Sequence, residues 1–263
     1  MDTQDVIRRI LLQRMARFAD AGPSLASAGT ARYRMEPTRV RVAYATLLPH
    51  MAPVAVQTVL RFARARRRTV QWLTIPDRAG EEGLAEALAS QGFQLTESLL
   101  LMAHEGQIPV LPSREISVER IRDWQHMWEY ERGSRLCFYQ ESTPAEGLVT
   151  ARAADRWQEQ ERGWCDYYRA VMNSRMIGGC YVSRYEDIPT IMGVYTLPEV
   201  RNQGVATQLL ARTVRDVVTS QNTLTCLFVE HGNPAERLYR SLGFIALQDW
   251  QTYTWGDHDN EAK

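Results

Sequence analysis

The sequence predicts a mixed α/β (α+β) fold built as two similar halves, each a mixed β-sheet with helices. The chain has 263 residues, which allows two modest domains at roughly 100–200 residues per domain. Alternating apolar positions typical of strands are interspersed with stretches of helical periodicity. The order strand, Pro, helix, strand, helix, Gly-Phe, strand occurs around residues 43–103 and again around residues 193–255.

The spacing inside these two segments is also similar. Pro49 and Gly92 are 43 positions apart, and Pro198 and Gly243 are 45 positions apart. We interpret the segments as an internal duplication. The alternative is that unrelated α/β proteins often share this order of elements.

We place the two domains at residues 1–107 and 114–256, on either side of a proline-containing linker at 108–113. In the first domain, apolar residues at helical spacing predict a helix over 3–20, and the small, polar residues up to about 37 predict a loop. The elements expected after this loop are a strand at 39–47, a helix at 53–66, a strand at 69–75, a helix at 80–90 and a strand at 93–103.

The second domain is expected to open with a strand near 114–118 and two helices. The first helix carries Ile121, Trp124 and Trp128, and the second spans 143–161. The elements expected after them are strands at 166–172 and 175–183 joined by a turn at Asn173-Ser174, a strand at 189–197, a helix at 204–220, a strand at 224–230, a helix at 235–242 and a strand at 244–255.

Composition and charge argue against several classes of protein. The 31 basic residues balance 31 acidic ones, which argues against non-specific nucleic-acid binding because that affinity depends on neutralised phosphates. The four cysteines lie far apart in the sequence, so we expect neither a disulfide framework nor a metal site. The longest apolar stretch, Leu99–Ala103, is far shorter than the roughly 20 residues of a membrane span. We therefore expect a cytoplasmic protein that contacts no membrane.

One segment has the features of an anion-binding loop. Thr196–Ala206 lies between the end of an expected strand and the start of an expected helix. At a helix start, consecutive backbone N–H groups lack partners within the helix, and the helix dipole adds positive potential. Gly204 and Ala206 are small enough to let a pyrophosphate approach the backbone, and Arg201 could add a charge-assisted contact. The alternative interpretation is a helix start that needs small residues only for packing.

A second motif begins 29 residues after Gly204, at Asn233, and ends with the sequence Leu-Tyr-Arg-Ser-Leu-Gly-Phe at 238–244. Together the two motifs resemble the GNAT acyltransferase superfamily, whose acetyl-CoA loop reads R/Q-x-x-G-x-G/A and whose later helix ends in Leu-Tyr-x-x-x-Gly-Phe. The resemblance covers roughly residues 114–255. The sequence departs from the family pattern in two places. Ala206 replaces a glycine, and Asn233 lies six residues before Tyr239, where many members have seven.

The resemblance implies that acetyl-CoA is the cosubstrate. Asn202–Thr207 would form the pyrophosphate cradle, and the backbone of Val194–Thr196 would pair with the pantetheine arm as an added strand does. Tyr239 would lie near the thioester sulfur, where a phenol of pKa near ~10 can protonate the departing thiolate. The alternatives are strand packing for Val194–Thr196 and a core-capping role for Tyr239. The complete set of implied acetyl-CoA-binding residues is Val194, Tyr195, Thr196, Arg201, Asn202, Gln203, Gly204, Val205, Ala206, Thr207 and Asn233.

The implied reaction is transfer of an acetyl group to a primary amine by direct attack in a ternary complex. Backbone N–H groups near Val194 would hold the developing oxyanion charge, and no cysteine or histidine is needed as a nucleophile. Glu230 and His231 are candidates for the general base. The alternative is that both are simply polar residues exposed at the end of a strand. We expect a small-molecule amine or a protein or peptide amine as the acceptor, and a monomer or homodimer.

The first half resembles a degenerate GNAT copy. His50–Ala55 stands where the loop would be, and Pro53 removes one of its backbone donors. Leu88 lies four residues before Gly92, where the second half has Tyr239. We therefore expect a structural partner that lacks both the cradle and the acid. The basic run Arg61–Arg68 is either a solvated helix end or a surface for an anionic partner.

Two other functions stay open at this point. The chain could be a non-catalytic acyl-CoA-binding or regulatory module, although the intact loop and Tyr239 argue against it. It could also be a tandem-GNAT synthase that uses a larger acyl donor.

Overall fold

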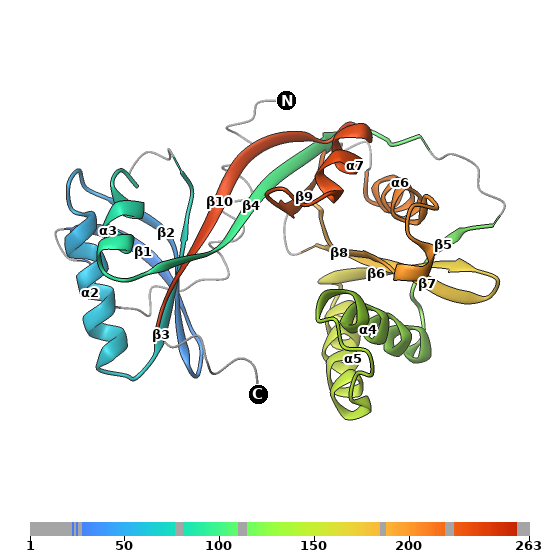
Figure 1. The fold of residues 1–263 in the computed structure, drawn as a ribbon, viewed down its shortest axis with the longest axis horizontal. Coiled ribbons are helices and arrows are strands. Elements are labelled where there is room, and N and C mark those ends of the chain that lie inside the picture. The colour runs from blue at the N-terminus through green and yellow to red at the C-terminus, as the bar shows by residue number, and fades with distance from the viewer. Residues whose placement is uncertain are drawn as a thin grey trace. The chain divides into compact units, whose positions relative to one another are not determined.

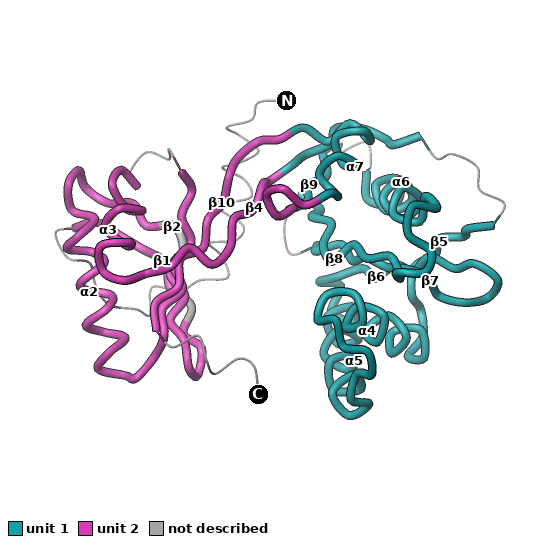
Figure 2. Tube along the Cα trace, viewed as in Figure 1, with its two compact units in different colours: residues 1, 102–228, 234–245 teal, residues 2–101, 229–233, 246–263 magenta. Residues whose placement is uncertain are grey.

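The computed structural model describes residues 23, 25, 28–76, 81–109, 115–184, 188–218 and 224–256. The chain divides into two compact units that do not follow chain order (Figure 2). Unit 1 contains residues 1, 102–228 and 234–245, and unit 2 contains residues 2–101, 229–233 and 246–263. The ranges expected from the sequence, 1–107 and 114–256, differ from these units mainly because the end of the chain belongs to unit 2.

Unit 2 contains a mixed sheet whose strands follow the hydrogen-bonding order β1-β2-β3-β10-β4. Strands β2 and β3 run parallel, whereas β1 pairs antiparallel with β2 and β10 pairs antiparallel with β3. The last strand of the second repeat is therefore part of the sheet that the first repeat forms. The elements are β1 (Gly29–Met35), β2 (Arg39–Leu47), α2 (Ala52–Arg64), β3 (Thr69–Thr74), α3 (Leu84–Ser90), β4 (Gln94–Glu105) and β10 (Ile245–Trp255).

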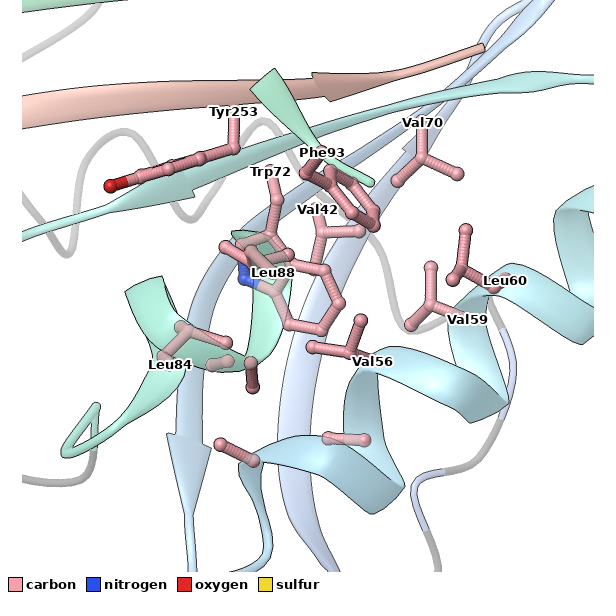
Figure 3. Close-up of a cluster of buried hydrophobic side chains, with 14 of the residues drawn as sticks. Val42, Val56, Val59, Leu60, Val70, Trp72, Leu84, Leu88, Phe93 and Tyr253 are labelled. Carbon is pink, nitrogen blue, oxygen red and sulfur yellow. The ribbon is translucent and has the colours of Figure 1, made fainter. Parts of the chain in front are cut away.

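The core of unit 2 lies between one face of this sheet and the helices α2 and α3 (Figure 3). The strand register places Tyr33, Val42, Trp72 and Tyr253 side by side across four strands, and all four are buried. Helix α2 meets this face with an apolar stripe at the three- and four-residue spacing of a helix. The stripe consists of Ala52, Ala55, Val56, Val59, Leu60 and Ala63.

Unit 1 contains a mixed sheet with helices on both faces. Its strands follow the order β4-β9-β8-β7-β6-β5, to which β4 contributes its last residues. Figure 1 shows α4 and α5 on one face of this sheet and α6 on the other. The elements are β5 (Ser117–Arg120), α4 (Trp124–Phe138), α5 (Glu146–Glu161), β6 (Cys165–Met172), β7 (Arg175–Ser183), β8 (Thr190–Thr196), the 3₁₀ turn η2 (Pro198–Val200), α6 (Val205–Val217), β9 (Leu224–Glu230) and α7 (Ala235–Ser241).

The two repeats have the predicted order of elements, β2-α2-β3-α3-β4 and β8-α6-β9-α7-β10. The first two strands of each repeat run parallel. After the second helix of each repeat, Gly92 and Gly243 have φ angles of 80° and 91°. Glycine adopts this left-handed conformation without strain, which explains why the same Gly-Phe pair ends both helices.

One prediction in the first half is wrong. The loop expected up to residue 37 contains β1, which pairs with β2 and places Tyr33 in the core. The predicted helix over 3–20 lies outside the described residues, as do residues 110–113 of the linker. The expected helices and strands within the described ranges are present, with bounds that differ by a few residues. Ile121 does not lie on the first helix of the second domain as expected, because Asp123 caps that helix and α4 begins at Trp124. None of the described helices is long and apolar enough to cross a membrane.

Candidate active site

Strand β8 has an irregular middle and a short pairing with β9. Its parallel register with β9 covers only Thr190 opposite Cys226 and Ile191 opposite Leu227. On the other side, β8 advances by three residues while β7 advances by two, between the Tyr181–Met192 and Gly179–Tyr195 pairs. This extra residue is a β-bulge. The bulge and the short register leave backbone groups in the second half of β8 without partners on β9.

The glycine in the bulge has a positive φ. Gly193 adopts a φ of 57°, and a Cβ there would approach the Tyr181 ring at 3.1 Å. Both the backbone conformation and the close ring favour glycine at this position. Val194 follows directly, so the bulge sets the direction of the Val194–Thr196 backbone.

The start of α6 presents free backbone donors. Gly204 is the N-cap with a φ of 81°, and the helix has no side-chain cap. The first helical hydrogen bond is donated by Gln208 to the Gly204 carbonyl. The N–H groups of Val205, Ala206 and Thr207 therefore have no acceptor in the helix.

The space in front of this helix start is open. A Cβ built on Gly204 meets no heavy atom within 4 Å, and Arg201–Gly204 are all exposed. Asn202 also has a positive φ, of 63°. The loop is thus exposed and the helix start uncapped, two features that a pyrophosphate cradle requires.

Arg201 is anchored at the end of β8. Its Nε donates to the Thr196 carbonyl oxygen over 3.4 Å, and the Cys137 thiol donates to the same oxygen over 3.6 Å. Burial raises the pKa of the Cys137 thiol, with Arg201 acting in the opposite direction. Cys137 is therefore held as a thiol that supports the strand end, not as a nucleophile.

The side chain of Tyr195 faces α4. It is buried, and its hydroxyl donates to the Tyr130 carbonyl oxygen over 3.0 Å. Gly133 of α4 has to be glycine because a Cβ there would lie 2.7 Å from the Tyr195 hydroxyl oxygen. Tyr195 is thus placed to contact a ligand through its backbone only.

Tyr239 lies on α7 with 6% of its surface exposed. Its hydroxyl has no hydrogen-bond partner within the described residues. Burial raises the pKa of Tyr239 to about 12, with a smaller contribution from Cys180. The phenol therefore keeps its proton at neutral pH, as a general acid must before it reacts.

The turn after β9 holds the remaining candidates. The backbone N–H of Asn233 donates to the backbone carbonyl oxygen of Glu230 over 3.1 Å. His231 Nε2 lies 2.8 Å from Asp249 Oδ1. The sequence reasoning missed Asp249 because it lies 18 positions further along, on β10. Residues 229–233, the last residues of β9 and the turn after it, belong to unit 2, whereas 194–207 and Tyr239 belong to unit 1.

The first repeat lacks these features. Its helix α2 begins at Ala52 with Pro53 in the first turn, so one backbone donor is missing there. Leu88 is completely buried, in the position that corresponds to Tyr239. Within the described residues, no group of three or more His, Cys, Asp or Glu could hold a metal ion.

Comparisons with known proteins agree with this geometry. Residues 168–255 match the family model described as FR47-like protein. No curated protein matches the sequence. A GCN5-related N-acetyltransferase from Kribbella flavida has a TM-score of 0.68 and 16% identity, over 98% of this chain and 97% of its own. A tandem GNAT protein from the clavulanic acid biosynthesis pathway has a TM-score of 0.64 and 15% identity, over 98% of both chains. A GCN5-related N-acetyltransferase from Sphaerobacter thermophilus has a TM-score of 0.64 and 16% identity, over 87% of this chain and 76% of its own.

The chain therefore has the fold of the GCN5-related N-acetyltransferases. Its residues 168–255 match the FR47-like model, and the tandem GNAT protein matches over 98% of both chains. The resemblance to the GNAT superfamily inferred from the two motifs is confirmed.

Proposed function

We propose that this protein is an acetyl-CoA-dependent N-acetyltransferase with one active site, formed by the second repeat. The observation that carries the proposal is the open start of α6, where Val205, Ala206 and Thr207 present uncapped N–H groups behind the exposed Gly204. Such a cradle fits a pyrophosphate. The second half of β8, which pairs with β7 but lies beyond its register with β9, fits the amide-containing pantetheine arm.

In this proposal the chain binds and orients the cosubstrate and supplies a proton. The second half of β8 holds the thioester through its backbone. An acceptor amine attacks the thioester carbonyl carbon, the C–N bond forms and the C–S bond breaks. Tyr239 donates its proton to the departing sulfur, since its hydroxyl is protonated and has no other partner. The nitrogen is positively charged once the C–N bond has formed, and it loses a proton to a base or to water.

The acceptor in this proposal is a primary amine, either on a small molecule or on a protein or peptide. The protein acts in the cytoplasm as a monomer or homodimer. Glu230 and His231 both remain candidates for the general base, and His231 Nε2 lies 2.8 Å from Asp249 Oδ1. A carboxylate partner fixes the tautomer and orientation of a histidine base.

The test combines binding and turnover. Calorimetry with acetyl-CoA is expected to give saturable binding, and a panel of primary amines is expected to include acceptors that release free CoA thiol. Binding without release for any amine would favour the non-catalytic acyl-CoA module. Turnover only with longer acyl-CoAs would favour the tandem synthase with a larger donor. Absence of binding to any acyl-CoA would overturn the proposal.

A further inference from the structure

A cavity lies in unit 1, away from the α6 loop. Its volume is about 640 Å³, within the range of roughly 300–1,000 Å³ that is usual for small-molecule sites. It is lined by β5, the start of α4, β6, the end of β7 and the second half of α6. The lining residues on α6, Arg212 and Asp216, come 8 and 12 positions after Gly204. A helix rises about 1.5 Å per residue, so they lie roughly 12 to 18 Å further along the helix.

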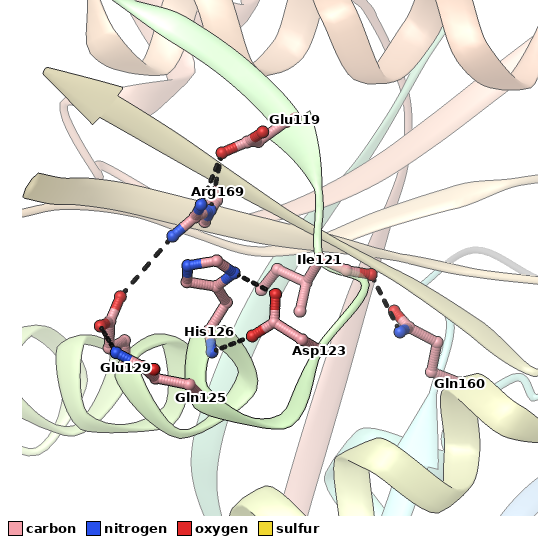
Figure 4. Close-up of polar contacts among 8 residues, drawn as sticks. All are labelled: Glu119, Ile121, Asp123, Gln125, His126, Glu129, Gln160 and Arg169. Carbon is pink, nitrogen blue, oxygen red and sulfur yellow. Dashed lines mark hydrogen bonds and ion pairs between the residues drawn. The ribbon is translucent and has the colours of Figure 1, made fainter. Parts of the chain in front are cut away.

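Arginine dominates the wall of this cavity. Five guanidinium groups line it, from Arg120, Arg122, Arg169, Arg184 and Arg212. Two of them are each matched by nearby carboxylates. Arg169 Nε donates to Glu119 over 2.9 Å, as Figure 4 shows, and Arg212 Nε donates to Asp216 over 2.9 Å.

The other three are not matched one to one. Arg120 and Arg184 share a single carboxylate, that of Asp166, which is only 2% exposed. The two guanidinium groups are 43% and 38% exposed. Arg122 is exposed and has no ion pair or hydrogen bond within the described residues. Three positive charges therefore face one buried negative charge.

The remaining acid of the wall is already engaged. Asp123 caps α4 by accepting from the His126 amide over 2.9 Å, and its second oxygen lies 2.5 Å from His126 Nδ1 (Figure 4). Its oxygens are thus directed toward the helix start and the imidazole. Asp123 therefore does not neutralise the excess positive charge of Arg120, Arg122 and Arg184.

The buried Asp166 orients two of these arginines. Arg120 reaches one carboxylate oxygen and Arg184 the other, so both guanidinium groups are held at one point of the wall. A guanidinium has five N–H donors in a planar fork, and most of those on Arg120 and Arg184 stay available. Paired guanidinium forks suit the oxygens of a phosphate or carboxylate group.

From this arrangement we propose that the cavity is a second ligand site, which takes the phosphate group of a small phosphorylated molecule between Arg120, Arg122 and Arg184. The cavity is several times larger than a phosphate ion, and the additional space beside Tyr168 and His126 accommodates an organic part. This site is independent of acetyl-CoA binding, because it shares no residue with the loop at 196–207. The alternative is that the charges only tie together β5, β6 and the end of β7.

The experiment measures binding of inorganic phosphate by calorimetry at matched ionic strength, since screening alone changes with salt. The Gly204→Val variant serves as background, because it blocks phosphate at the α6 loop. Saturable binding is expected in this background. Arg122→Gln and Arg120→Gln are each expected to weaken it about tenfold or more, as loss of a charge-assisted hydrogen bond does.

Arg61→Gln is the matched control. Arg61 is exposed on α2 in unit 2 and has no ion pair within the described residues, so its loss removes the same charge without touching the cavity. Phosphate affinity is expected to stay within twofold. Succinate in place of phosphate separates the two anion chemistries, and binding of succinate alone would contradict the choice of phosphate.

Two results would overturn the site. One is an absence of saturable phosphate binding to the Gly204→Val background, provided that its thermal unfolding shows a folded protein. The other is equal loss of affinity in Arg122→Gln and Arg61→Gln, which would mean that only net charge matters. Nitrogen-15 spectra of the arginine Nε–H groups give a second readout, because phosphate should shift the Arg122 signal.

Discussion

The hydroxyl of Tyr195 on β8 donates a buried hydrogen bond to the carbonyl oxygen of Tyr130 on α4, over 3.0 Å. The two rings also meet edge to face, with centroids 5.5 Å apart. This contact fixes the second half of β8, the segment proposed to hold the thioester, against helix α4. The Tyr195 side chain thus supports a strand whose backbone is proposed to hold the ligand.

Tyr195→Phe is expected to lower the free energy of unfolding by about 0.5–1.5 kcal/mol, because one buried hydrogen bond is lost while the Tyr130 carbonyl keeps its partner within helix α4. Acetyl-CoA affinity is expected to change little, since the backbone of β8 is unaltered. Urea unfolding and calorimetry measure the two effects. The control is Tyr139→Phe, which removes a hydroxyl from a ring that is 63% exposed. Equal stability of the two variants would show that the Tyr195 bond contributes nothing.

Gly204→Val is expected to weaken acetyl-CoA binding by well over tenfold. A β-branched residue cannot adopt the φ of 81° without strain, and its side chain would fill the open space in front of the α6 amides. Calorimetry measures the loss of affinity.

Gly83→Val is the matched control for this change. Gly83 is the N-cap of α3 with a φ of 69°, and a Cβ there also meets nothing within 4 Å. Its substitution introduces the same backbone strain in unit 2. The control is expected to lose stability but to retain acetyl-CoA affinity. Equal weakening by both substitutions would mean that strain, not blocked access, causes the effect.

Local patterns were enough to predict most elements. The bounds of β7 and β9 were predicted to the residue, because both strands lie between clear turn or loop residues. Strand β1 was missed because Gly29–Met35 contains small and charged residues, and its pairing with β2 makes it a strand. The pairing of β10 with β3 joins residues about 180 positions apart, and no local pattern reports which strand is the partner.

In the candidate site, too, local sequence predicted some features, whereas others depend on contacts between distant residues. The loop at 201–207 and the helix with Tyr239 were found from sequence because their chemistry is local to a helix start and a helix. Gly193 was a signal that went unused, since an isolated glycine in a strand indicates a bulge. The contacts of Tyr195 with Tyr130 and of His231 with Asp249 depend on tertiary packing, which spacing along the chain does not report.

Acetyl-CoA is expected to bind once per chain. In the first repeat, the first turn of α2 contains Pro53, which lacks the N–H that the cradle needs, and Leu88 stands in the place of Tyr239. Calorimetry should give one site per chain with full-length protein. Two equivalent sites would contradict the assignment of the first repeat as a structural partner.

Self-acetylation is expected at no more than two positions. Lys263 is the only lysine of the chain, and the N-terminal amine is the other available nitrogen nucleophile, because arginine stays protonated. Intact-mass spectrometry after long incubation with acetyl-CoA measures the number of added groups. Three or more acetyl groups that resist hydroxylamine, which removes thioesters and phenolic esters, would show that other nucleophiles react.

Tyr239→Phe is expected to lower turnover by roughly 10- to 10⁴-fold while acetyl-CoA affinity changes little, because the variant lacks the proton donor for the CoA thiolate.

Burial raises the pKa of Tyr239 to about 12. The phenol stays protonated as pH rises through 10, where an ordinary tyrosine loses its proton. The wild-type rate should therefore show no loss from Tyr239 ionisation until pH approaches 12.

Tyr33→Phe is the matched control for Tyr239→Phe, since Tyr33 is also buried with an unpartnered hydroxyl, in unit 2. Unchanged turnover in Tyr239→Phe, with chemistry shown to be rate-limiting, would mean that Tyr239 serves only packing against Phe244.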